Sequence, residues 1–149
     1  MYKSLSQELL EISELKTNKE KIEALVSHRR AEAFKTIFSY TYDPNIKWLL
    51  PEGNPPYKPC DLLDLEGRLL HELRRLYLFV EGGNPNLTKA RRETLFIQIL
   101  ESVHPDDAKL LLAMKERKLP FKGLNKKLIN QAFSDINIEV IKEENEQVV

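Results

Sequence analysis

The strongest signal of the fold lies in residues 104–133, which read HPDDAKLLLAMKERKLPFKGLNKKLINQAF. Proline suits the first turn of a helix, where its missing N–H costs nothing, and the two aspartates after it face the positive end of the helix dipole. We therefore predict a helix that starts at His104, with a capping role for that residue, and runs to about Lys118. A short final helix is expected from about Asn125 to Phe133, after the polar cap that Asn125 provides.

Helical periodicity also dominates the rest of the chain. Thr17 and Glu20 form a capping-box pattern at the start of a second helix, which we expect to bury Ile22, Leu25 and Val26. Apolar residues at helical spacing predict further helices over about 5–15, 30–41, 62–81 and 88–102. The helix over 62–81 is expected to be long and continuous, with an apolar stripe made of Leu62, Leu69, Leu73, Leu76, Tyr77 and Val80.

One segment breaks the pattern. Residues 43–61 contain five of the eight prolines, and proline density of this kind excludes a regular helix. Ile46, Trp48, Leu49 and Leu50 are too apolar to stay in water, so we expect an ordered Pro-rich loop packed on the bundle. The sequence thus predicts an all-α protein: a single compact domain over 1–136, with six or seven helices, followed by an acidic flexible tail at 137–149.

Composition limits the classes of function. The chain has 149 residues, 42% of them hydrophobic, and equal numbers of acidic and basic residues, so any binding to a polyanion must come from a local patch. A single cysteine, Cys60, excludes an internal disulfide framework. Neither a signal peptide nor an apolar run long enough for a membrane is visible. We expect a cytoplasmic protein without a membrane partner.

A basic turn is the main candidate site. Residues 115–127 carry six cations and one anion, and a glycine followed by a polar helix cap directs free backbone N–H groups outward, which suits a phosphate. Nucleic acid is therefore the first partner to consider. The alternative for the same residues is a solvated cationic face. The candidate nucleic-acid-binding residues are Arg117, Lys118, Lys122, Gly123, Asn125, Lys126 and Lys127, joined by Arg91 and Arg92 near the start of the 88–102 helix.

The order of the pieces resembles the helical N-terminal DNA-binding domain of ATP-dependent DNA ligases, above all those of T4-like phages. The resemblance rests on residues 9–12 with 17–22, on 34–42, and on 106–119 with Gly123 and 128–133. The chain departs from the ligases at Lys118, in the length of the turn before Gly123, at Ser134-Asp135 and in the Pro-rich loop. It lacks the Lys-x-Asp/Asn-Gly nucleophile, so the resemblance implies a stand-alone, non-catalytic module that holds the duplex backbone without strong sequence preference.

A second resemblance is to a small uncharacterised family of T4-like phage proteins, carried by residues 51–53, 55–57 and 76–87. It implies a phage protein that acts in the host cytoplasm, and it attaches no activity to the chain. The alternative function is therefore a protein-interaction module that engages a host or phage replication protein. Its anchors would be Trp48, Pro55, Pro56, Tyr57 and an exposed Phe121.

Catalysis and metal binding have the least support. The three histidines have no spacing typical of a metal site, and no Gly-rich phosphate loop or nucleophile elbow is present. We expect no catalytic residues, no metal and no cofactor, and therefore no enzyme.

Overall fold

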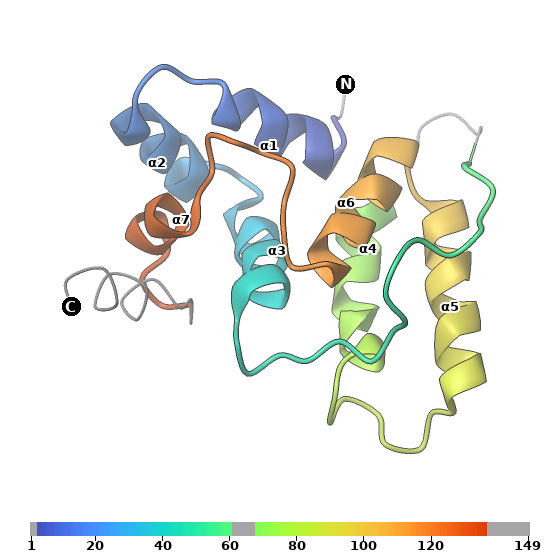
Figure 1. Cartoon of the computed structure of the whole chain (residues 1–149). Coiled ribbons are helices and arrows are strands. Elements are labelled where there is room, and N and C mark those ends of the chain that lie inside the picture. The colour runs from blue at the N-terminus through green and yellow to red at the C-terminus, as the bar shows by residue number, and fades with distance from the viewer. Residues whose placement is uncertain (1–2, 61–67, 137–149) are drawn as a thin grey trace.

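The structure, a computed structural model, describes residues 3–60 and 68–136. All regular elements in these two ranges are helices (Figure 1), and an isolated bridge between Trp48 and Val80 is their nearest approach to a sheet. The predicted all-α class is thereby confirmed. The elements are α1 (Leu5–Ser13), α2 (Asn18–Ser27), α3 (Ala31–Tyr42), α4 (Arg68–Glu72), the 3₁₀ helix η1 (Leu73–Phe79), α5 (Lys89–Ser102), α6 (Pro105–Lys115) and α7 (Lys126–Ala132).

Helix α6 lies at the centre of the bundle. It contacts α1, α3 and α5, and its buried residues form a broad face, whereas Asp106 and Lys109 are exposed on the remaining side. Helices α1, α2 and α7 lie on one side of α3 and α6, and α5 lies on the other (Figure 1). A broad apolar face, together with the proline and aspartates of the first turn, explains why residues 104–115 give so clear a signal in the sequence. The buried residues of α6 are Asp107, Ala108, Leu110, Leu111, Leu112, Met114 and Lys115.

Side-chain caps fix the starts of five helices, as the sequence suggests for three of them. Thr17 accepts a hydrogen bond from the N–H of Glu20, and Asn125 accepts one from Leu128. The Nδ1 of His104 accepts from the N–H of Asp106 at 3.1 Å, which confirms the predicted capping role. Each cap satisfies a donor that the first helical turn leaves unpaired. The other two caps are Ser4 and Thr88.

The prediction of one long α-helix over 62–81 is wrong for the residues from 68 onward, which the structure describes. α4 ends at Glu72, and the chain continues as a 3₁₀ helix to Phe79. Three residues per turn bring Leu73, Leu76 and Phe79 to one side, and all three are buried. Val80 then becomes extended, because this stretch of backbone pairs with the Pro-rich loop. Residues 62–67 lie outside the described residues.

The Pro-rich loop packs on the bundle through Trp48, Leu50 and Tyr57, as expected, whereas Leu49 is 37% exposed. The indole N–H of Trp48 donates to the carbonyl of Tyr40 at 2.8 Å, and the two rings meet edge to face. The N–H of Leu49 donates to Phe79, and that of Glu81 donates to Lys47. These contacts tie the first half of the loop to the end of η1.

The expected burial of Val26 in α2 is wrong. Val26 is 51% exposed and does not join the core, whereas Leu25 in the same helix is fully buried. α2 presents a narrow apolar stripe to its neighbours, and Val26 falls beside it. The acidic tail at 137–149 lies outside the described residues.

Candidate functional site

The predicted basic turn joins α6 to α7 and starts with a strained residue. Arg117 has φ +63°, a left-handed conformation that ends α6 earlier than the sequence suggests. Its guanidinium donates to the carbonyls of Asp43 and Ile46, at 2.6 and 2.7 Å. Arg117 therefore fastens the start of the Pro-rich loop to the end of α6, and its charge is engaged within the fold.

Lys115 is also engaged within the fold. Its side chain is only 3% exposed, and its Nζ donates to the carbonyls of Pro51 and Gly53 and to the carboxylate of Glu116, all within 2.9 Å. The pKa of Glu116 is lowered, first by this hydrogen bond from Lys115 and next by the one from the N–H of Gly53. Lys115 thus shapes the loop and offers no exposed charge to a ligand.

Gly123 marks a close approach of two segments. A Cβ built at this position would lie 2.2 Å from the carbonyl oxygen of Ser13 and 2.8 Å from the Nζ of Lys21. The turn therefore passes directly over the end of α1, and only glycine leaves room for that contact. The same contact places the ammonium of Lys21, from α2, beside the basic turn.

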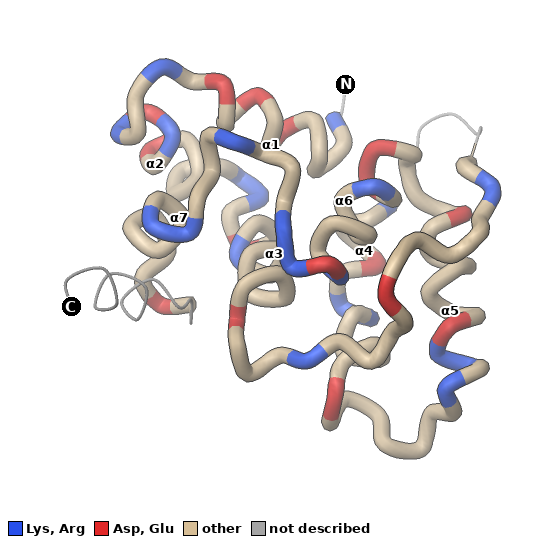
Figure 2. Tube along the Cα trace, viewed as in Figure 1, with Lys and Arg blue, Asp and Glu red and all other residues tan. Residues whose placement is uncertain are grey.

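Four lysines of the turn and of α7 are exposed or half-exposed. Lys118, Lys122 and Lys127 are exposed, while the Nζ of Lys126 lies 5.7 Å from the ring centroid of Tyr42. In Figure 2 the positively charged stretches of this turn and of α7 run along one side of the molecule. Residues 116–127 hold five cations and one anion. We call Lys21, Lys118, Lys122, Lys126 and Lys127 the basic face.

Arg91 and Arg92 do not belong to the basic face. They lie in α5, on the opposite side of the bundle from α7 (Figure 1). Arg91 is exposed, whereas Arg92 is half-buried and donates to the carbonyl of Leu87 at 3.1 Å. The nine residues proposed from the sequence are thus divided between two separate regions. Asn125 lies at the edge of the basic face, where its side chain caps α7.

The residues predicted to anchor a protein partner also lie in different environments. Phe121 is 5% exposed and belongs to the core, so it does not offer the exposed surface expected of it. Trp48 and Tyr57 are half-buried and pack against the core. Pro55 and Pro56 have a different role: they form part of the wall of a cavity.

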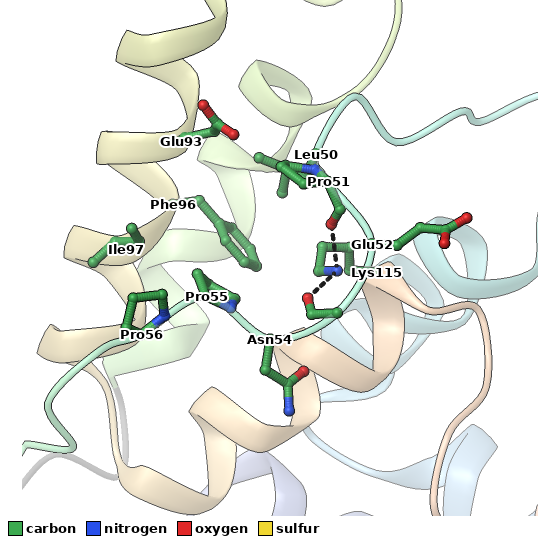
Figure 3. A pocket seen from close by; sticks show the side chains of 11 residues that line it. Leu50, Pro51, Glu52, Asn54, Pro55, Pro56, Glu93, Phe96, Ile97 and Lys115 are labelled. Carbon is green, nitrogen blue, oxygen red and sulfur yellow. Dashed lines mark hydrogen bonds between the residues drawn. The ribbon is translucent and has the colours of Figure 1, made fainter.

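This cavity lies between the Pro-rich loop and α5 and has a volume of about 380 Å³ (Figure 3). Leu50, Pro55 and Pro56 line it from the loop, and Phe96 and Ile97 line it from α5. Lys115 closes one side with its two hydrogen bonds to the loop. Nothing in the local sequence pattern indicates this site, because its walls come from segments that are far apart in the sequence.

A buried carboxylate is a further feature that the sequence does not reveal. Asp107 is fully buried in α6, and one of its oxygens accepts from the N–H of Ser6 at 2.9 Å. Burial raises the pKa of Asp107 to about 6, while the hydrogen bond from the N–H of Ser6 opposes the rise. Asp107 therefore caps the start of α1 from a distant helix.

The described parts of the chain give no sign of a metal centre or a membrane span. Within residues 3–60 and 68–136, no three His, Cys, Asp or Glu side chains gather in a way that could hold a metal ion. None of the helices in those ranges combines the length and apolar character needed to cross a bilayer.

Comparison with known proteins points to one family. A protein-family model described as "Family of unknown function (DUF6433)" matches residues 9–120. The matched span contains every residue that lines the cavity and ends before Lys122. No curated protein matches the chain.

Proposed function

We propose that this chain, which belongs to the DUF6433 family, is a non-catalytic module that binds the backbone of double-stranded DNA through its basic face. The observation that carries the proposal is the convergence of lysines from separate segments: the close contact at Gly123 brings Lys21 of α2 to the lysines that precede and open α7. On a chain of zero net charge, this local excess is what a polyanion would recognise.

The residue types on this face favour contacts with phosphates over readout of bases. Lysine ammonium groups act as point charges, whereas base recognition relies on planar, bidentate groups such as arginine, asparagine or glutamine. Arg117, the arginine of the turn, is held by loop carbonyls. Binding without strong sequence preference follows, in keeping with the resemblance of residues 106–133 to the last helices of the ligase domain.

The size of the salt effect can be estimated. If the four lysines at 118–127 each contact a phosphate, the logarithm of affinity falls with the logarithm of salt with a slope of about −3.6. Raising salt fourfold would then weaken binding roughly 150-fold. A salt effect of this size distinguishes phosphate contacts from apolar association.

The test is fluorescence anisotropy of labelled intact duplex, nicked duplex and single-stranded DNA over a range of salt. Lys118→Gln with Lys122→Gln removes two charges from exposed side chains and should reduce the slope by about 1.8. Lys89→Gln with Arg91→Gln makes the same change of net charge on α5 and should leave the slope unaltered. Absence of duplex binding at low salt, or an equal loss in both pairs, would overturn the proposal.

The second candidate, a protein-interaction module, is favoured by one specific observation: the cavity beneath the Pro-rich loop. None of the lysines of the basic face lines this cavity, so one molecule could use both.

A further inference from the structure

We propose that the cavity between the Pro-rich loop and α5 binds a segment of a partner protein in which an apolar side chain stands next to a lysine or an arginine. The cavity holds about 380 Å³, near the lower end of the range for ligand sites, which suits one large side chain. This site is separate from the basic face, and the inference does not depend on DNA binding.

The first argument is that the cavity is already formed without a ligand. The ammonium of Lys115 binds the carbonyls of Pro51 and Gly53, and the carboxylate of Glu116 accepts from the N–H of Gly53 at 2.8 Å. Gly53 has φ +82°, which lets the loop turn around that ammonium. The loop conformation is therefore fixed in advance, and a ligand would bind without first ordering it.

The second argument concerns the free energy needed to bury the ammonium of Lys115. Removing an ammonium from water is expensive, even when carbonyls and a carboxylate replace the water. The loop that Lys115 holds gives little burial in return, because residues 51–54 are all exposed. A buried charge that shapes an exposed loop is better explained by the surface it creates than by the stability of the core.

The third argument is the apolar lining. In Figure 3 the ring of Phe96 points from α5 towards the loop and lies near Pro55, while Leu50 lies at the other end; Ile97 and Pro56 complete the apolar lining. These surfaces are suited to an aromatic or aliphatic group, which would be removed from water on entry.

The fourth argument is the sign of the charge at the cavity. Glu93 lines it from α5 and Glu52 lines it from the loop. Glu93 is half-buried and pairs with no cation among the described residues. The charge of Lys115 is compensated by its carbonyl partners and by Glu116, so carboxylates determine the local potential. This complementarity selects a cation beside the apolar group and disfavours an anion.

The fifth argument favours a peptide over a free small molecule. Asn54 lines the cavity, is exposed, and makes no hydrogen bond within the described residues, so its amide is available to donors and acceptors of a peptide backbone. A polar group at the rim and an apolar centre are the usual arrangement at protein interfaces.

The test is a titration of the isotopically labelled full chain with three short peptides, followed by amide chemical shifts. Acetyl-Gly-Phe-Arg-Gly-amide should shift the amides of Gly53, Asn54 and Ile97. The peptide with Phe-Glu at its centre should bind up to about fivefold more weakly, as expected for loss of one half-exposed charge pair. The peptide with Gly-Arg should bind about tenfold more weakly or worse, because it lacks the apolar anchor.

Variants separate the two parts of the recognition. Glu93→Gln should weaken binding of the Phe-Arg peptide about fivefold, because one charge pair is lost. Binding of the Phe-Glu peptide should not become weaker. Ile97→Gln should weaken both Phe peptides. Glu32→Gln, the same charge change at a side chain of α3 that is 89% exposed and does not line the cavity, should have no effect. Lack of shifts around the cavity with the Phe-Arg peptide, or equal binding of the Phe-Glu peptide, would refute the inference. Lys118→Gln with Lys122→Gln should not alter peptide binding, so failure here and failure of DNA binding remain distinguishable.

Discussion

Replacing the buried Asp107 by asparagine should make the protein more stable at neutral pH and change how its stability depends on pH. The ordinary pKa of an aspartate here is 3.8, and burial raises it to about 6 in the folded protein. Between these two values the folded state binds more protons than the unfolded state, so the free energy of unfolding falls as pH rises through this window. The full penalty of the buried charge is present above about pH 6.

The magnitude follows from the interval between the two pKa values. At about 1.4 kcal/mol per pH unit, an interval of about 2 units corresponds to about 3 kcal/mol. Asparagine keeps an oxygen that can accept from the N–H of Ser6, but it carries no charge at any pH. The free energy of unfolding of Asp107→Asn should therefore equal that of the wild type near pH 4 and exceed it by about 3 kcal/mol at pH 7.

Urea unfolding at a series of pH values between 4 and 7, followed by circular dichroism, measures this difference. His104 and Asp106 lie nearby and are the same in both proteins, so their electrostatic effects largely cancel in the comparison. Asp106→Asn is the matched control: its side chain is half-exposed, so removing that charge relieves little burial. If the advantage of Asp107→Asn does not grow with pH, the hydrogen bonds to the start of α1 compensate the buried charge, and the reasoning is wrong.

Three other substitutions are each tested by urea unfolding of the full chain: two at contacts that shape the two sites, and one at the buried ion pair of Arg30 and Glu8. Lys115→Met should lower the free energy of unfolding by about 1–3 kcal/mol, because two loop carbonyls lose their donor, and should broaden the amide resonances of the loop; unchanged resonances would contradict this role. Gly123→Ala should destabilise by about 1–3 kcal/mol, since its Cβ would meet the backbone of Ser13, and a neutral result would mean that the turn shifts freely. Arg30→Met should cost about 3 kcal/mol, because the carboxylate of Glu8, bound to Arg30 at 2.6 Å, would stay buried with less compensation; a cost below about 1 kcal/mol would show that water replaces the arginine.

Much of the fold could be predicted from local signals in the sequence. Helix starts depend on a few neighbouring residues, and the caps at Thr17, His104 and Asn125 lie where the local pattern indicates. The change from α to 3₁₀ helix at Leu73 could not be predicted in this way. Apolar residues three apart are compatible with both helix types, and the pairing of Val80 with a loop 30 residues earlier decides between them.

The candidate site was predicted less well than the fold, and for a physical reason. The sequence shows where the cations are, but it does not show which of them form hydrogen bonds within the folded protein. Lys115 and Arg117 bind loop carbonyls 62–74 residues earlier in the chain, and no local pattern reveals such partners. Charge and position at a helix start group Arg91 and Arg92 with the turn in the sequence, whereas the packing of α5 and α7 on opposite sides of the bundle separates them.

The position of Trp48 gives the protein an internal fluorescent reporter. It is the chain's single tryptophan, and its indole N–H is bonded to Tyr40 while its backbone pairs with Val80. Its emission therefore senses whether the Pro-rich loop lies on α3 and η1, whereas far-ultraviolet circular dichroism senses the helices themselves. If the two signals change at different denaturant concentrations, the loop detaches as an independent unit before the bundle unfolds. If they coincide, the loop and the bundle form one cooperative structure, and the walls of the cavity are as stable as the core.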